Sequence, residues 1–267
     1  MRANALLAVL LACPAAADSG LKAFPRADEL FPVLLAAPKQ FQLAASRYVL
    51  NDKSYSDLSL GHAWGLLRGR AGDQMTQWQW DARAMSYSRW GGHGLEAVDL
   101  LGELPVAVRR GDVSALGSLF YESSHLGDDH IRRTGRPARR TNATGLRLIA
   151  AIEPWTWLRT YGGASFLLDT EPSPKRWGLQ AGAEVMSGDL GLSQAVPVRL
   201  YAAEDLQFPE RVGFNPNSHA VIGAQLGWKG SRRTARLQVG YYSGHSYFGQ
   251  FQADREHFAD VAVILEL

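Results

Sequence analysis

Apolar and polar side chains alternate along most of the chain, in stretches separated by Gly, Pro, Asn, Asp and Ser. A two-residue period places successive side chains on opposite faces of a strand, so the pattern predicts strands with one apolar and one polar face. The expected strands run over residues 41–50, 57–68, 76–88, 103–110, 113–123, 141–152, 156–169, 175–186, 193–204, 217–229, 233–243 and 257–267. Their lengths lie near the ~9–11 residues that a tilted strand needs to cross a membrane.

The residues on the two faces of these strands indicate which face points outwards and which points into the barrel. Trp78 and Trp80 alternate with Gln79 and Asp81, and other strands repeat this arrangement. An apolar outside and a charged inside is the reverse of a soluble barrel, whose interior is packed and dry. The sequence therefore predicts an all-β fold over residues 41–267: a single antiparallel transmembrane β-barrel of the outer-membrane type, with about twelve strands.

Connector lengths form a second pattern. Connectors alternate between short and long along the chain, and the long polar ones are expected over 89–102, 124–140, 205–216 and 244–256. Outer-membrane barrels have short turns on one rim and longer loops on the other, so we expect the long connectors on one rim. The connectors 51–56 and 170–174 break the alternation, because they are no longer than the modest turns 69–75 and 187–192.

Charged residues at inward positions are expected to occupy the lumen. They are Asp81, Arg83, Arg147, Glu184, Arg199 and Arg236. About twelve strands leave a narrow interior once long side chains enter it. We therefore expect a salt-bridged interior in preference to an open pore.

The N-terminal residues indicate export. Residues 1–17 combine Arg2, an apolar run and an Ala-rich end, which predicts a secretory signal peptide in a Gram-negative bacterium and a protein of the outer membrane. The rival interpretation is a lipoprotein signal in which Cys13, the only cysteine, carries the lipid. Cleavage after residue 17 leaves no cysteine for disulfides or a thiolate metal site. Residues 18–40 contain three prolines and are expected to form a periplasmic lead-in with a short helix over 27–35.

Net charge and charge distribution exclude one class of partner. The formal net charge is +2, and no basic run carries interleaved aromatic residues. Proteins that bind single-stranded nucleic acid combine a basic groove with aromatic stacking platforms, so no nucleic-acid partner is expected. The expected partners are outer-membrane lipids, lipopolysaccharide and the machinery that assembles barrels.

Three segments carry a family resemblance. They are Leu30–Phe41 (LFPVLLAAPKQF), Phe120–Asp129 (FYESSHLGDD) and Tyr241–Gln250 (YYSGHSYFGQ). On these segments the chain resembles the bacterial outer-membrane family known as domain of unknown function 1207 (DUF1207). The resemblance implies a secreted outer-membrane barrel and implies no activity.

The segment SSHLGDD and the strand that follows it contain candidate catalytic residues. Ser123 and His125 fall on one strand face, and Asn142 is expected beside them on the returning strand. In a hydrolase that resembles outer-membrane phospholipase A in architecture, Ser123 would attack an acyl ester, His125 would take its proton and Asn142 would orient the imidazole. That enzyme has histidine, one residue, then serine, and this spacing places Tyr121 where the histidine would be.

Asp128 and Asp129 would bind calcium in such an enzyme, since calcium prefers oxygen ligands. No other cofactor is expected. The alternative interpretation is that Ser123 and His125 make rim hydrogen bonds, while the two aspartates pair with nearby arginines.

An arginine cluster follows the aspartates. Arg132, Arg133 and Arg136 would bind lipid phosphate, because a guanidinium group suits bidentate contact with phosphate. The alternative is a solvated loop balanced by the aspartates. Three functions therefore stay open: a non-enzymatic envelope or ligand-binding barrel, a lipid-acyl hydrolase of the phospholipase A or lipid A deacylase type, and a narrow diffusion channel. The first is favoured.

Overall fold

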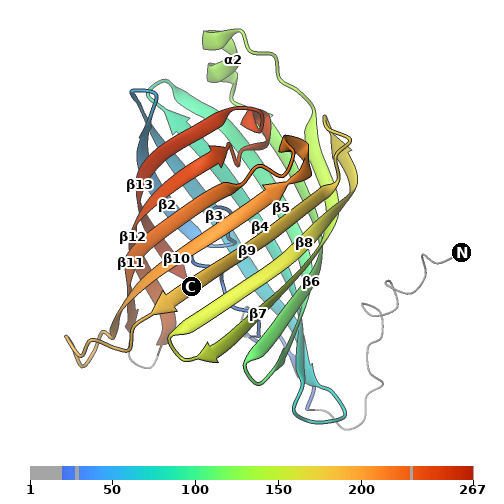
Figure 1. The fold of residues 1–267 in the computed structure, drawn as a ribbon, viewed down its shortest axis with the longest axis vertical. Helices are drawn as coiled ribbons and strands as arrows, with labels where there is room; N and C mark the ends of the chain where they lie inside the picture. The colour runs from blue at the N-terminus through green and yellow to red at the C-terminus, as the bar shows by residue number, and fades with distance from the viewer. Residues whose placement is uncertain (1–19, 28–29, 229–230, 267) are drawn as a thin grey trace, which may run out of the picture.

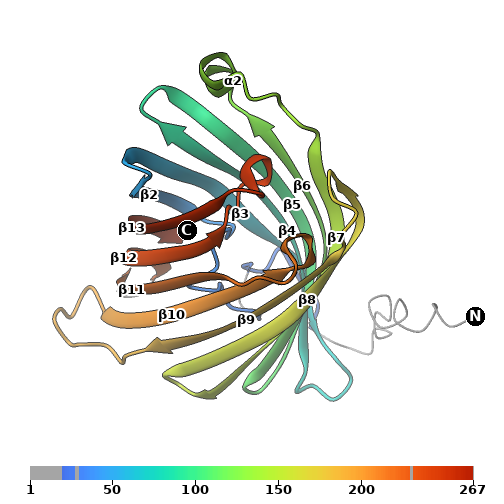
Figure 2. The same ribbon diagram turned by 45° about the horizontal axis from the view of Figure 1, so that its top comes forward.

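A closed antiparallel barrel forms the body of the protein (Figures 1 and 2). The computed structural model describes residues 20–27, 30–228 and 231–266. Each strand of the barrel pairs with its neighbours in sequence, and the barrel closes where the first strand pairs with the last. The barrel strands of the described residues are β2 (Leu43–Leu50), β3 (Lys53–Arg70), β4 (Gln77–Gly91), β5 (Gly94–Arg110), β6 (Val113–Leu126), β7 (Thr141–Trp155), β8 (Leu158–Glu171), β9 (Trp177–Met186), β10 (Val198–Pro209), β11 (Asn217–Trp228), β12 (Ser231–His245) and β13 (Arg255–Glu266).

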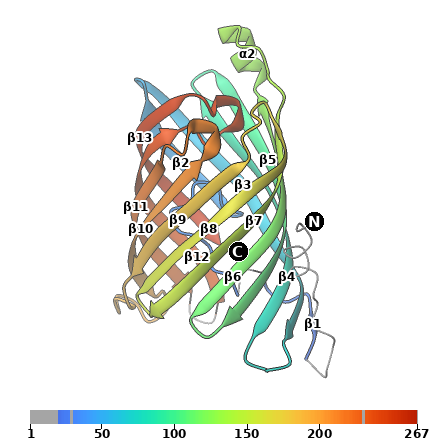
Figure 3. The ribbon, with the colours of Figure 1, turned by 45° about the vertical axis from the view of Figure 1, so that its right-hand side comes forward.

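All twelve expected strands are present, so the predicted fold class is confirmed. A further two-residue strand, β1 (Lys22–Ala23), pairs with the lower part of β3. The helix α2 (Asp128–Thr134) lies beyond one end of the barrel, which we call the upper rim (Figure 3). No helix within the described ranges is both long and apolar enough to span a membrane. The predicted signal peptide over residues 1–17 lies outside the described residues.

The predicted loop over 89–102 is wrong. Strands β4 and β5 run through this segment and meet in a tight turn at residues 92–93. The segment was expected to be a polar connector, but the side chains of its acidic residues Glu96 and Asp99 are buried and pair with basic residues from other elements. Inward-facing charged residues therefore give a strand of such a barrel a polar sequence, which resembles the sequence of a loop.

The expected sorting of connectors by length holds only in part. The upper rim carries the long connectors 127–140 and 246–254, but also the tight turns 51–52 and 92–93. On the lower rim, the connector 187–197 is long, although the sequence predicted a strand from 193. The Oδ1 atom of Asp189 accepts the N–H groups of Gly191 (3.1 Å) and Val198 (3.1 Å), and these bonds delay the start of β10.

The inside and outside of the barrel have the predicted chemistry. Gln79 and Asp81 are each 1 % exposed, whereas Trp80 on the alternate face is 40 % exposed. The last strand alternates in the same way, with Val263 exposed and Ile264 buried. The outer surface is apolar and the lumen is polar, as an outer-membrane-type barrel requires.

The segment before the first barrel strand lies inside the barrel. We call residues 30–42 the plug segment. Its apolar side chains are buried: Leu30, Phe31, Leu34, Leu35, Ala36 and Ala37. The expected helix over 27–35 does not form in the described residues of that range. Pro32 lacks an N–H donor and restricts the residue before it, which disfavours a helix here.

The barrel wall supplies hydrogen bonds to the plug backbone. Glu184 accepts the N–H of Leu35 (2.7 Å), and His219 contacts the carbonyl of Ala36 (2.7 Å). Guanidinium groups donate to other carbonyls: Arg159 to Val33 (3.2 Å) and Arg236 to Leu35 (3.5 Å). Irregular backbone is stable at this depth only when its polar groups have partners. Glu184 and Arg236, which the sequence placed in the lumen, therefore hold the plug segment.

A lid covers part of the upper mouth. We call residues 246–254 the lid segment; it contains the 3₁₀ turn η2 (Gly249–Phe251). Phe248 is fully buried, and the guanidinium group of Arg89 lies 4.5 Å from its ring centroid. Arg89 also donates two hydrogen bonds to Glu256 (2.6 and 3.0 Å), beyond the end of the lid. Phe248 of the lid therefore packs against an arginine whose hydrogen bonds to Glu256 join β4 to β13.

Close packing where the plug joins β2 gives a first prediction. A Cβ atom on Gly61 would lie 2.7 Å from the backbone nitrogen of Gln42 and 2.9 Å from backbone carbons of Phe41. Gly61→Ala should lower the free energy of unfolding by about 1–3 kcal/mol, because the backbone must move. Gly102→Ala in β5 is the matched control, since nothing lies within 4 Å of its added Cβ. Thermal unfolding of both refolded variants measures the difference, and equal melting temperatures would contradict the close packing.

Candidate functional site

The three predicted catalytic residues share the outward face of two neighbouring strands. Ser123 and His125 stand two residues apart on β6, and Asn142 on β7 is the register partner of Ser123. Tyr121 has the same orientation and is 49 % exposed. The structure therefore brings the three residues onto one surface near the upper rim.

These three side chains are not linked to one another. Among the described residues, no hydrogen bond joins Ser123, His125 and Asn142, and the buried Oδ1 atom of Asn142 has no partner. The Cα atoms of residues two apart on a strand are separated by roughly 7 Å, so the two side chains must lean towards each other to bond, and those of Ser123 and His125 do not. A serine nucleophile needs a base within hydrogen-bond distance. The arrangement contains the residues of a hydrolase site without their contacts.

The serine next to the candidate nucleophile has a structural role. Ser124 faces inward and is buried, and its Oγ atom accepts the N–H of Gln250 in the lid (2.9 Å). The side-chain amide of Gln250 donates to the carbonyl of Ser124 (2.7 Å) and to the carbonyl of Arg139 (2.7 Å). Ser124 thus fastens the lid to the rim.

The two aspartates lie in the first turn of α2. Asp129 pairs with Arg132 (2.7 Å), and the side chain of Asp128 is exposed. Across the described ranges, no three His, Cys, Asp or Glu side chains are grouped closely enough to hold a metal ion. The calcium site considered from the sequence thus has two adjacent carboxylates, one of which is paired with arginine.

The arginine cluster is engaged in ion pairs. Arg133 pairs with Glu96 of β5 (2.5 Å), and the imidazole of His130 contacts the same carboxylate. Arg136 pairs with Asp254 (2.8 Å) and donates to the carbonyl of Gln250 (3.1 Å), which connects the α2 loop to the lid. Among the described residues, Arg132 pairs with Asp129 alone, within α2, and its side chain is exposed. Two of the three arginines therefore hold the upper rim together.

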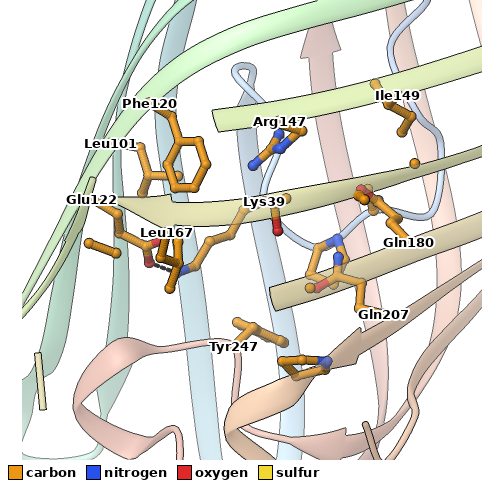
Figure 4. A pocket seen from close by; sticks show the side chains of 18 of the residues that line it. Lys39, Leu101, Phe120, Glu122, Arg147, Ile149, Leu167, Gln180, Gln207 and Tyr247 are labelled. Carbon is orange, nitrogen blue, oxygen red and sulfur yellow. Dashed lines mark hydrogen bonds and ion pairs between the residues drawn. The ribbon is translucent and has the colours of Figure 1, made fainter. Parts of the chain in front are cut away.

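A cavity of about 250 Å³ lies inside the barrel above the plug segment (Figure 4). Its floor is the plug, its wall includes β6 to β9, and the lid lies over one side. Its lining extends to residues 170–176, where β8 turns into β9 at the exposed upper rim. The cavity is therefore enclosed below and continuous with the rim above.

Lys39 at the end of the plug is the central charge of this cavity. Its ammonium group lies 2.5 Å from Asp99 on β5 and 2.5 Å from Glu122 on β6. The same Oδ2 atom of Asp99 accepts the N–H of Gly249 in the lid (3.1 Å). One lysine and one aspartate therefore connect the plug, the wall and the lid.

A second cation is held at the mouth of the cavity. Arg211 lies in the 3₁₀ turn η1 (Glu210–Val212) and lines the cavity. Its neighbour Glu210 accepts the N–H groups of Trp177 (3.1 Å) and Arg176 (3.0 Å), and these backbone hydrogen bonds lower the pKa of Glu210. The contact fixes η1 against the β8–β9 turn, and Arg211 with it.

The sequence pattern did not indicate Lys39 or Arg211 as site residues. Lys39 belongs to a segment that was expected outside the barrel, and Arg211 belongs to a connector with no regular period. One signal was present: residues 30–38 are almost wholly apolar and contain two prolines, which is unusual for a solvated lead-in. An apolar segment without a period fits a buried, irregular chain.

The family comparison covers nearly the whole sequence. Residues 15–264 match the family described as "Protein of unknown function (DUF1207)". The chain belongs to the DUF1207 family. The resemblance noted in three segments is thus confirmed, and no curated protein matches the chain.

Solved structures with a similar fold are outer-membrane barrels. Outer membrane phospholipase A from Escherichia coli has a TM-score of 0.53 at 14 % identity, covering 88 % of the DUF1207 chain and 95 % of its own. The Salmonella typhi phospholipase, solved as a dimer with bound calcium, has a TM-score of 0.52 at 13 % identity, covering 87 % and 92 %. The KdgM porin has a TM-score of 0.46 at 9 % identity, covering 85 % and 99 %. At these identities the likeness to the two phospholipases establishes the barrel fold and no shared activity.

The buried position of Lys39 gives a second prediction. Lys39→Met would leave Asp99 and Glu122 side by side without their cation, at a cost of about 3–5 kcal/mol. We expect a lower melting temperature and a rise in ion conductance in planar bilayers as the plug loosens. Lys175→Met is the control, because Lys175 is exposed and its pair with Glu210 is 3.6 Å long, which contributes about 0–1 kcal/mol.

The conservative variant Lys39→Arg separates loss of charge from loss of folding. It should keep the wild-type conductance because the cation is retained. If Lys39→Met matches Lys175→Met in both melting temperature and conductance, Lys39 does not hold the plug.

Proposed function

We propose that this DUF1207 protein is a non-enzymatic barrel of the outer membrane that admits small molecules through its upper mouth and binds them above a closed lumen. The observation that carries the proposal is the cavity itself. It is open towards the upper rim and ends at a plug that is ion-paired to the wall through Lys39.

The plug supports a closed lumen. Its backbone and side chains contact β5, β6, β8, β9, β11 and β12, which make up half of the barrel strands. Each contact couples a charged or polar wall side chain to the plug, so displacement would leave buried charges without partners. This arrangement favours a binding barrel over a constitutively open channel.

The outer surface supports a place in a membrane. Exposed apolar side chains occur on strands all around the barrel, including Leu60, Leu148, Ile222 and Val263. A soluble protein rarely exposes apolar patches of this extent, whereas lipid covers them. Contact with outer-membrane lipids and lipopolysaccharide, and insertion by the barrel-assembly machinery after export, follow from this placement as part of the proposal.

One observation favours the lipid hydrolase as a second candidate. Ser123 and Asn142 are directly opposed on the lipid-facing side of β6 and β7, with His125 on the same surface. A substrate acyl chain would reach them from the membrane. The missing contact between Ser123 and His125 ranks this candidate second.

Access to the cavity gives a third prediction. Ser165 on β8 lines the cavity, whereas Ser114 on β6 is inward-facing and only 2 % exposed. In a Cys13→Ala background, Ser165→Cys should react with methyl methanethiosulfonate in the folded protein, and Ser114→Cys should react only after unfolding. Mass spectrometry of the refolded protein measures both. Equal, slow labelling of the two thiols would show that the cavity is sealed and would refute the proposed function.

Lipid turnover gives a fourth prediction and decides between the two candidates. Fatty-acid release from phospholipid micelles should be no greater for the wild type than for Ser123→Ala or His125→Ala, with or without calcium. The outer membrane phospholipase A of Escherichia coli serves as the active control. If the wild type releases fatty acid and both Ser123→Ala and His125→Ala abolish the release, the protein is a hydrolase and the binding proposal is wrong.

A further inference from the structure

Some polar side chains of the cavity already have protein partners, whereas others have hydrogen-bond donors or acceptors left for a ligand. These remaining donors and acceptors indicate the class of ligand. The inference rests on the proposed function, because it needs a cavity that small molecules can enter. The ammonium group of Lys39 is engaged by two carboxylates, so it offsets one of their two negative charges and offers no free positive charge to a ligand.

Two arginines have donors to spare. Arg147 on β7 has one distant carboxylate, Glu103 at 3.6 Å, and lies over the ring of Phe120 at 5.2 Å. Arg211 makes no hydrogen bond or ion pair within the described residues. Its side chain is accessible to water, although the barrel mouth surrounds it. Partial removal from water lowers the pKa of Arg211, and the nearby Glu122 carboxylate opposes this effect. A guanidinium group stays protonated throughout the physiological range, so both residues are permanent cations.

Two glutamines offer acceptors rather than donors. The amide nitrogens of Gln180 and Gln207 donate to the two oxygens of Asp205, at 2.6 and 2.9 Å. Asp205 also accepts the hydroxyl of Tyr161 at 2.8 Å, so it is satisfied by donors from three directions. An ionised carboxylate only accepts hydrogen bonds, which fixes each amide with its nitrogen towards Asp205 and its oxygen away from it. Figure 4 shows both glutamines beside Lys39 and Arg147 at the cavity.

We propose that the cavity binds a small hydroxylated anion, with Arg147 and Arg211 binding its carboxylate or phosphate group and Gln180 and Gln207 accepting its hydroxyl groups. A sugar acid and a sugar phosphate share this chemistry. A cation would be repelled by the two guanidinium groups, and a neutral sugar would leave their spare donors without a charged acceptor.

The test measures binding to the refolded full-length chain in detergent by isothermal titration calorimetry. The probes are glucuronate, glucose 6-phosphate, inorganic phosphate and glucose. We expect glucuronate or glucose 6-phosphate to bind at least about tenfold more tightly than glucose, since hydrogen bonds to charged groups are the strong ones. Inorganic phosphate should bind more weakly than glucose 6-phosphate, because it lacks the hydroxyl groups that the glutamines accept.

The variants Arg147→Gln and Arg211→Gln should each weaken binding of the preferred probe by about tenfold or more. Arg110→Gln is the matched control, because Arg110 is an exposed arginine on the lower rim, 3.5 Å from Asp73. Circular dichroism and heat-dependent gel mobility confirm that each variant forms the barrel. Glucuronate and glucose 6-phosphate together distinguish a carboxylate from a phosphate ligand.

Several results would overturn the inference. Glucose binding as tightly as the anions would do so, as would equal affinities for the wild type and both cavity arginine variants. Absence of binding by every probe, while Ser165→Cys is readily labelled, would reject the anion site and leave an accessible cavity standing. Failure of both binding and labelling would reject the proposed function itself.

Discussion

The ion pairs of Lys39 with Asp99 and Glu122 are the interaction on which the interior depends. A barrel that is apolar outside collects its charges inside, and each buried charge needs a partner of opposite sign. Lys39 reaches these two carboxylates from a segment that precedes every barrel strand in sequence. Asp99 also accepts the N–H of Gly249, so its carboxylate connects the plug to the lid.

The plug follows the same logic. Its residues are too apolar to be solvated and too rich in proline for a helix, so its backbone polar groups must find partners on the wall. Arg159, Glu184 and Arg236 supply them, which explains why charges of both signs face the lumen. The result is a plug segment bonded to the barrel wall, with a cavity between it and the upper rim.

The motif SSHLGDD at the upper rim has side chains on both the inner and the outer face of the barrel. In SSHLGDD, Ser124 points inward and fastens the lid, while Ser123 and His125 point outward without contacts to each other. Gly127 is required for packing, since a Cβ atom there would lie 1.9 Å from the carbonyl oxygen of Leu95. Much of the motif is therefore explained by closure of the rim, whereas Ser123, His125 and the neighbouring Asn142 of β7 make no contact that this closure needs.

The sequence by itself determined the barrel, its twelve strands and the direction of its faces, because a two-residue period is a local property that burial on one side enforces. It also placed Ser123, His125 and Asn142 on one surface, since cross-strand neighbours follow from a hairpin register. Only the tertiary structure decided that the plug enters the lumen, that Glu96 and Asp99 lie in strands, and that Arg211 lines the cavity. These depend on contacts between residues far apart in the chain, and no local period records where a distant partner will lie.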